Sequence, residues 1–159
     1  MKTKITSVLL ICSLMCLSIF STHNVTYAND NSTITYFEDG SYLVTIIESC
    51  DDYTLNSREL TITENKTKTS NYYDSNNELL WYVKVKGNFT YNGTTATCNS
   101  SEVVAASNNS NWKISNRSAS KSGSTAYASC TAKRYSGSTV VQTINRQVSL
   151  HCSPSGVYS

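Results

Sequence analysis

The chain has 159 residues, with 13 Lys and Arg against 11 Asp and Glu. Two of the bases, Lys2 and Lys4, belong to a predicted leader. Without these two residues the chain has 11 bases and 11 acids, so overall basicity gives no reason to expect nucleic-acid binding. The length is close to that of one domain, which is enough to bury a core without a metal or many crosslinks.

The first 28 residues have the features of a secretory signal peptide. Lys2 and Lys4 form a basic start, residues 8–20 are uncharged and largely apolar, and Ala28 suits the position before a cleavage point. The apolar run is roughly 13 residues long, whereas a membrane-spanning helix needs about 20. We therefore expect cleavage after Ala28 and a secreted chain of one domain, residues 29–159, without a transmembrane segment.

Alternating apolar and polar residues predict strands through the rest of the chain, and no segment has a helical apolar stripe. Asp39-Gly40 predicts a hairpin turn between strands at 32–38 and 41–49. Further strands are predicted at 58–63, 66–73, 78–91, 102–106 and 111–118, with a turn at 121–123. Eight or nine short strands predict an all-β protein with a single antiparallel β-sandwich, a β-barrel being the alternative.

The strand at 78–91 has the clearest alternation. Its predicted inward residues are Leu79, Trp81, Val83, Val85, Phe89 and Tyr91. Gly87 interrupts this face and indicates a bulge or a close approach of another chain segment. The following Asn92-Gly93 predicts a two-residue type I′ turn, which would pair Gly87 with Cys98 and point Cys98 into the core.

The last two strands each place apolar residues at even positions. These are Ala126, Ala128, Cys130 and Ala132 in the first strand and Val140, Ile144, Val148 and Leu150 in the second. A two-residue turn would put one of the two sets outside, so we expect a three-residue loop at 135–137 with Gly137 left-handed. Ala132 would then face Val140 and Ala128 would face Ile144, small against large.

Four cysteines follow the predicted leader: Cys50, Cys98, Cys130 and Cys152. An even number in a secreted domain predicts two disulfides. The positions on the predicted core faces favour Cys98–Cys152 and Cys50–Cys130, and the other connectivities stay open. No Cys-x-x-Cys spacing and no nearby His pair is present, so neither a metal site nor a cofactor is expected.

Two tryptophans, Trp81 and Trp112, share their faces with Val and Ile and are predicted core anchors. Among Tyr72, Tyr73 and Tyr82 at least some point outward, where they could stack on sugar rings or simply serve as strand formers.

Several segments of the chain resemble segments of a known group of proteins. They are Leu80-Trp81-Tyr82-Val83-Lys84-Val85-Lys86-Gly87-Asn88-Phe89-Thr90-Tyr91-Asn92-Gly93 with the run to Cys98, then Trp112-Lys113-Ile114, residues 123–135, and Val148-Ser149-Leu150-His151-Cys152. Over residues 80–156 the chain resembles an uncharacterised family of small secreted β-rich proteins of Firmicutes, which are Gram-positive bacteria. The resemblance implies secretion and a β-rich fold but no activity. Cys98 and Cys152 look like the family's cysteines, whereas Cys50 and Cys130 are particular to this chain.

No catalytic constellation is recognisable. His151 is the one histidine after the leader, and strand alternation turns it away from the core. Asp51-Asp52 and Glu38-Asp39 lie in turn-like contexts, where acids commonly satisfy backbone groups. We therefore interpret the protein as a non-enzymatic extracellular domain that binds a cell-wall polymer, a glycan or another protein. A secreted antibacterial toxin or an enzyme inhibitor is the alternative.

Charge is unevenly distributed along the chain. Residues 29–80 hold ten acids and three bases, whereas residues 81–159 hold eight bases and one acid. Alternation predicts an outward face for an anionic ligand, made of Tyr82, Lys84, Lys86, Lys113, Arg117 and Lys133. If the strands share a sheet, these cations would attract an anionic polymer. The alternatives are that the two halves pair with each other or that the lysines keep exposed strands soluble.

Overall fold

The computed structural model describes residues 26–29, 32–56 and 61–159. They form nine strands: β1 (Thr26–Asn29), β2 (Ser32–Tyr36), β3 (Tyr42–Asn56), β4 (Thr61–Tyr73), β5 (Leu79–Tyr91), β6 (Ala96–Ser107), β7 (Trp112–Ser122), β8 (Thr125–Ser136) and β9 (Thr139–His151). All strand pairs are antiparallel. The predicted all-β class is confirmed.

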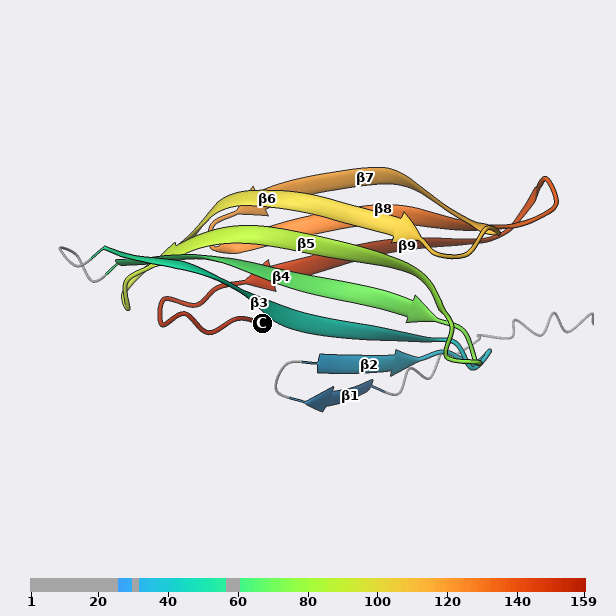
Figure 1. The fold of residues 1–159 in the computed structure, drawn as a ribbon, viewed down its shortest axis with the longest axis horizontal. Helices are drawn as coiled ribbons and strands as arrows, with labels where there is room; N and C mark the ends of the chain where they lie inside the picture. The colour runs from blue at the N-terminus through green and yellow to red at the C-terminus, as the bar shows by residue number, and fades with distance from the viewer. Residues whose placement is uncertain (1–25, 30–31, 57–60) are drawn as a thin grey trace, which may run out of the picture.

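The strands form two sheets in sequence order. One sheet has the order β1-β2-β3-β4-β5-β6 and the other β7-β8-β9, an arrangement consistent with the predicted sandwich rather than a barrel. The three-stranded sheet packs against β4, β5 and β6, while β1 and β2 lie beyond it at the edge of the larger sheet (Figure 1). Within the described part of the chain, no helix has the length and apolar character needed to cross a bilayer.

The core lies where β5 faces β8. Trp81, Val83, Val85 and Phe89 of β5 are fully buried. The predicted small face of β8 is also buried, with Ala126, Ala128, Cys130 and Ala132 exposing 3 % or less. Trp112 is 4 % exposed, so both tryptophans are core anchors as predicted.

Gly87 marks a close approach between the sheets, as the sequence predicts. A Cβ at this position would lie 2.3 Å from the Phe89 ring and 3.1 Å from the Ala126 Cβ. Phe89 therefore fills the space that a side chain at residue 87 would need, and the two sheets approach there because neither Gly87 nor Ala126 is bulky.

The β5–β6 hairpin differs from the predicted two-residue turn. Tyr91 pairs with Ala96, so four residues connect the strands, and Phe89 rather than Gly87 pairs with Cys98. Gly93 has a positive φ of 84°. The Asn92 side chain instead accepts hydrogen bonds from the Thr94 and Thr95 backbone N–H groups at 3.0 and 2.8 Å. This side-chain cap favours the longer loop, and a shift of two residues leaves Cys98 in the core.

The β8–β9 hairpin also differs in detail. Ser136 pairs with Thr139, which leaves the two-residue turn that the sequence argument excluded. A bulge between Arg134 and Tyr135 brings the even positions from Gln142 onward opposite the even positions of β8. Val140 lies beyond the bulge, pairs with Tyr135 and is 42 % exposed, so its predicted place on the buried face is wrong. Ala132 pairs with Ile144 instead of Val140, and Ala128 pairs with Val148. Gly137 has the predicted positive φ, at 61°.

Three smaller expectations change in the structure. The strands predicted at 58–63 and 66–73 form one strand, β4, with residues 57–60 outside the described part. A bulge beside Tyr72 pairs Tyr73 with Leu79, which moves Leu79 from the predicted inner face to the outer one. The turn predicted at 121–123 lies at 123–124 instead.

We expect Gly87→Ala to destabilise the protein by about 1–3 kcal/mol, because the new methyl group must displace the Phe89 ring. Urea unfolding of the single variant, of Phe89→Leu and of the double variant measures the coupling. The double variant should lose less stability than the two single variants summed. Strict additivity would contradict the contact.

Candidate binding site

A tight turn joins β2 to β3 and is held by the side chain of Asp39. The Phe37 N–H donates to the Ser41 carbonyl at 2.9 Å, and Gly40 has a φ of 79°. The Asp39 carboxylate accepts hydrogen bonds from the Ser41 hydroxyl and, at 3.0 Å, from the Ser41 N–H. The hydroxyl bond is the main cause that lowers the pKa of Asp39. The carboxylate therefore stays ionised at neutral pH.

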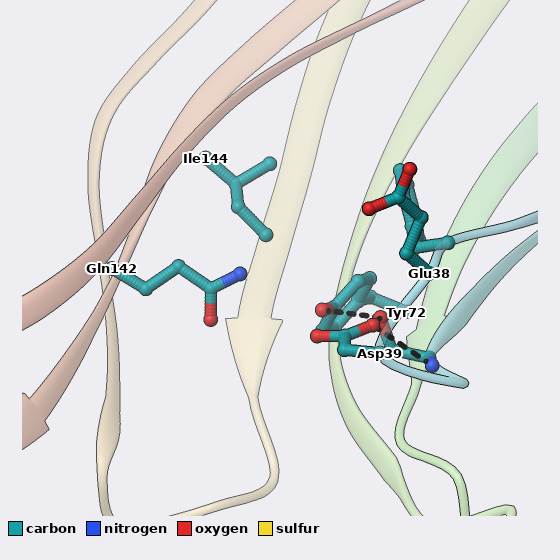
Figure 2. Close-up of a pocket in the computed structure, with 7 residues that line it drawn as sticks. Glu38, Asp39, Tyr72, Gln142 and Ile144 are labelled. Atoms are coloured by element: carbon teal, nitrogen blue, oxygen red, sulfur yellow. Dashed lines mark hydrogen bonds between the residues drawn. The ribbon is translucent and has the colours of Figure 1, made fainter. Parts of the chain in front are cut away.

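A cavity of about 300 Å³ lies between this turn and β9. Gln142 and Ile144 of β9 face Asp39, Glu38 and Tyr72 across it (Figure 2). Phe37 and Ser41 complete the lining. The cavity therefore has apolar groups on parts of its wall and carboxylate, amide and hydroxyl oxygens on others.

An aromatic cluster supports the cavity at Tyr72. The Tyr72 ring stacks on Trp81 with centroids 5.1 Å apart, and Trp112 lies 5.6 Å away in an edge-on arrangement. The Tyr72 hydroxyl donates to the Ser41 Oγ at 2.9 Å. Burial raises the pKa of Tyr72. The ring thus points inward and connects the core directly to the turn.

The outward tyrosines pack mainly on one another. Tyr73 and Tyr42 stack at 5.0 Å with an interplanar angle of 11°, and Tyr36 lies 5.5 Å from Tyr42. Because neighbouring strands hold these rings face to face, the face of Tyr42 that meets Tyr73 is not open to a sugar. Tyr82 is also outward and lines a shallow groove on the larger sheet.

The predicted cationic face does not form as one surface. Lys84 and Lys86 lie on β5 in the six-stranded sheet, whereas Lys113 and Lys133 are paired residues of β7 and β8 in the other sheet. The condition that these strands share a sheet is therefore not met, because the chain changes sheets between β6 and β7. Arg117 donates from Nε to the Ala105 carbonyl at 2.9 Å and bridges the two sheet edges instead.

Acids also reach the cations of the larger sheet. Lys84 pairs with Glu48 at 3.4 Å and Lys86 with Glu102 at 3.8 Å. The Lys113 ammonium lies 5.2 Å from the centre of the Tyr135 ring. Lys84, Lys86 and Lys113 thus have local partners, and the nearly acid-free face expected from the sequence is not observed.

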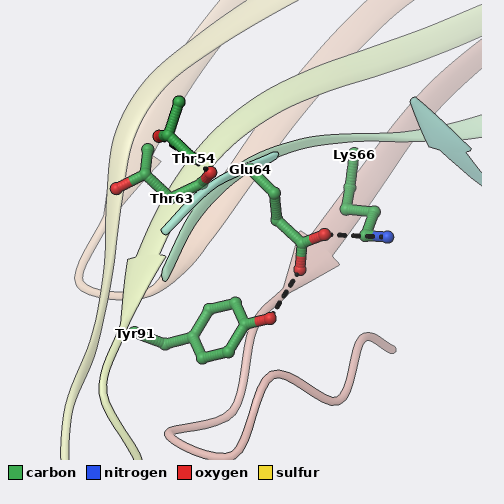
Figure 3. A network of polar contacts seen from close by, with 5 residues as sticks. All are labelled: Thr54, Thr63, Glu64, Lys66 and Tyr91. Atoms are coloured by element: carbon green, nitrogen blue, oxygen red, sulfur yellow. Dashed lines mark hydrogen bonds and ion pairs between the residues drawn. The ribbon is translucent and has the colours of Figure 1, made fainter. Parts of the chain in front are cut away.

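A polar network lies at the opposite end of the sandwich. The Glu64 carboxylate accepts a hydrogen bond from the Tyr91 hydroxyl at 3.0 Å and pairs with Lys66 at 3.1 Å (Figure 3). Burial is the main cause that raises the pKa of Tyr91 to about 12. The C-terminal tail packs closely against this network. A Cβ added at Gly156 would lie only 2.5 Å from the Tyr91 ring. This network fixes the tail in place.

Three cysteines have described side chains, and each is a buried free thiol: Cys98, Cys130 and Cys152. The predicted Cys98–Cys152 bond is not formed, since Cys98 Sγ points to the Ser100 carbonyl at 3.2 Å and Cys152 Sγ to the Ser153 carbonyl at 3.3 Å. The predicted Cys50–Cys130 bond involves a side chain outside the described part. Burial raises the pKa of all three thiols, which makes them poor nucleophiles.

His151 is exposed at the end of β9, as alternation predicts. Its Nδ1 lies 3.2 Å from the Ser124 hydroxyl and 3.1 Å from that of Thr125. Among the described residues, no group of three or more His, Cys, Asp or Glu side chains is placed to hold a metal ion.

The sequence argument identified the turn and the inward position of Ile144, but it missed Gln142 and did not place either residue opposite the turn. Gln142 and Ile144 belong to the even, inward positions of β9, and so does Arg146. A polar residue at an inward position was the signal, because it requires a partner or a solvent-filled space.

We expect the three described thiols to be protected from alkylation in the native protein and to react after denaturation without reductant. Mass spectrometry of iodoacetamide-treated protein measures both states. Modification of Cys98 or Cys152 in the native state would contradict their burial, and no reaction after denaturation would show that they are oxidised instead.

No protein-family profile, curated protein or solved structure matches the chain. The geometry of the cavity beneath the 37–41 turn is therefore the strongest basis for a functional proposal.

Proposed function

We propose that the chain is a secreted, non-enzymatic domain that binds a glycan, with a sugar ring in the cavity beneath the 37–41 turn. The observation that carries the proposal is that apolar groups line one part of the cavity wall and hydrogen-bonding groups line another. Phe37 and Ile144 supply apolar surface, while Glu38, Asp39 and Gln142 supply hydrogen-bonding groups. A sugar ring has matching chemistry, with C–H groups on its faces and hydroxyl donors at its edge.

The size and charge of the cavity support a neutral sugar. A volume of about 300 Å³ is at the lower end for small-ligand pockets, which suits one ring rather than a long segment. Carboxylate oxygens accept strong, charge-assisted hydrogen bonds from hydroxyl groups. The same carboxylates repel an anion, so an anionic wall polymer is a poor candidate for this cavity.

The state of Asp39 supports binding rather than glycoside hydrolysis. Hydrolysis needs one carboxylic acid that is protonated and can donate to the leaving group. The hydrogen bond from Ser41 lowers the pKa of Asp39 and favours the carboxylate. Asp39 thus serves as an acceptor that holds the turn and lines the cavity.

Secretion is the second part of the proposal. It is supported by the basic start, the apolar run at 8–20 and the small residue Ala28. The resemblance to small secreted proteins of Firmicutes agrees with it. Because β1 spans Thr26–Asn29, cleavage after Ala28 would remove most of this strand and leave β2 at the edge of the sheet.

We expect the intact mass of the protein recovered from culture medium to correspond to residues 29–159. Recovery of the full-length chain from the cell fraction alone would contradict secretion. The same measurement would reveal a different cleavage point.

We expect the secreted protein to bind neutral oligosaccharides on a glycan array, and Glu38→Gln or Phe37→Ala to weaken binding at least tenfold. A lost hydrogen bond to a charged group costs about 1.5–3 kcal/mol, and about 1.4 kcal/mol corresponds to tenfold. Titration calorimetry with the best array ligand measures the change.

Glu102→Gln is the matched control for Glu38→Gln. It makes the same chemical change on the outer face of β6, where Glu102 pairs with Lys86. Equal weakening by both variants, or binding by wild type that neither Glu38→Gln nor Phe37→Ala alters, would refute the cavity as the site.

A further inference from the structure

A second hollow lies on the inner face of the larger sheet, where β9 crosses β3 and β4. It encloses about 220 Å³. Lys68 of β4 and Arg146 of β9 supply its charges, and Thr33, Thr35 and Thr45 supply hydroxyl groups. The three-stranded sheet packs on β4, β5 and β6 and leaves β1 and β2 outside it (Figure 1). Thr33 and Thr35 of β2 therefore line the hollow at the margin of the packed region.

Arg146 is held in a fixed orientation by two hydroxyl groups. Its Nε donates to the Ser70 Oγ at 3.1 Å, and its Nη2 donates to the Thr45 Oγ1 at 3.3 Å. Ser70 is fully buried, so this anchor is rigid. A guanidinium carries five N–H donors, and these two bonds leave three for a ligand.

Neither cation is paired with an acid among the residues that the structure describes. The ion pairs there join Lys66 to Glu64, Lys84 to Glu48 and Lys86 to Glu102. The titratable group facing Arg146 besides Lys68 is the Cys130 thiol. Two half-buried positive charges thus lie together with hydroxyl groups around them.

This arrangement is unfavourable without a counter-charge. Burial lowers the pKa of both Lys68 and Arg146, and the charge of Arg146 lowers the pKa of Lys68 further. An anion between the two cations would offset the cost of their desolvation and of their mutual repulsion. A guanidinium also binds the oxygens of a planar or tetrahedral oxyanion in pairs, which an ammonium group cannot do.

We propose that the hollow between Arg146 and Lys68 binds an oxyanion, namely a phosphate, sulfate or carboxylate group. The proposal does not depend on glycan binding. Lys68 and Tyr72 are four residues apart on β4, which corresponds to roughly 13 Å along a strand. The oxyanion site and the sugar cavity are therefore separate places along the same seam between β4 and β9.

Titration of the secreted protein with inorganic phosphate, at constant ionic strength set with sodium chloride, tests the proposal. We expect saturable binding by calorimetry and a rise in the melting temperature with phosphate concentration. Lys68→Gln should weaken phosphate binding at least tenfold, and Arg146→Lys should weaken it while keeping the charge. Absence of saturable binding by wild type would overturn the proposal.

Lys113→Gln is the matched control, because Lys113 lies over Tyr135 on the other sheet. It should leave phosphate binding unchanged, and an equal loss in Lys113→Gln and Lys68→Gln would show non-specific attraction and overturn the site. Glu38→Gln should also leave phosphate binding unchanged, which separates this result from the glycan test. Circular dichroism of each variant checks that it is folded.

Two further ligands distinguish the sources of the anion. Dimethyl phosphate stands in for the phosphodiester of a polymer, and inorganic phosphate for a free ion. Binding of both supports an oxyanion site that accepts a polymer link, whereas binding of inorganic phosphate alone supports an oxyanion site for a free or terminal group.

Discussion

The close approach of β8 to β5 is the constraint on which the rest of the molecule depends. Four small side chains of β8 are buried against the large residues of β5, and Gly87 leaves room for the Phe89 ring beside Ala126. This spacing brings the neighbouring strands β9 and β4 together along one seam. Both hollows lie on that seam, since Gln142 and Ile144 face Tyr72 in one and Arg146 approaches Thr45 and Lys68 in the other.

Alternation predicted the buried side of the central part of β5, β8 and β9, even where the predicted pairing was wrong, but it failed beyond the bulges, at Leu79 and at Val140. Cys98 is in the core although it pairs with Phe89 instead of Gly87, because a shift of two residues preserves the face. The bulge at Arg134 and Tyr135 has the same effect in the last hairpin. Loop lengths were less predictable, since they depend on side-chain caps such as that of Asn92, and on bulges, neither of which follows a period.

The assignment of strands to sheets could not be read from periodicity. Lys84 and Lys113 both have the outward pattern, but they belong to different sheets because the chain crosses over between β6 and β7. The candidate sites could not be predicted from the sequence for the same reason. The turn at Asp39 was predictable from its local sequence, whereas its position opposite Gln142, about a hundred residues later, follows from the packing of the sheets.

The order of the strands has a consequence for how the chain folds. Every hydrogen-bonded strand neighbour is also a neighbour in sequence, so each sheet can grow by adding one hairpin at a time. Such local pairing gives a low contact order for an all-β protein, and low contact order favours fast folding. The contacts that close long loops are those between the sheets, such as Arg146 with Thr45. Docking of the two preformed sheets, joined by the short connection at 108–111, is therefore the step that should limit the folding rate.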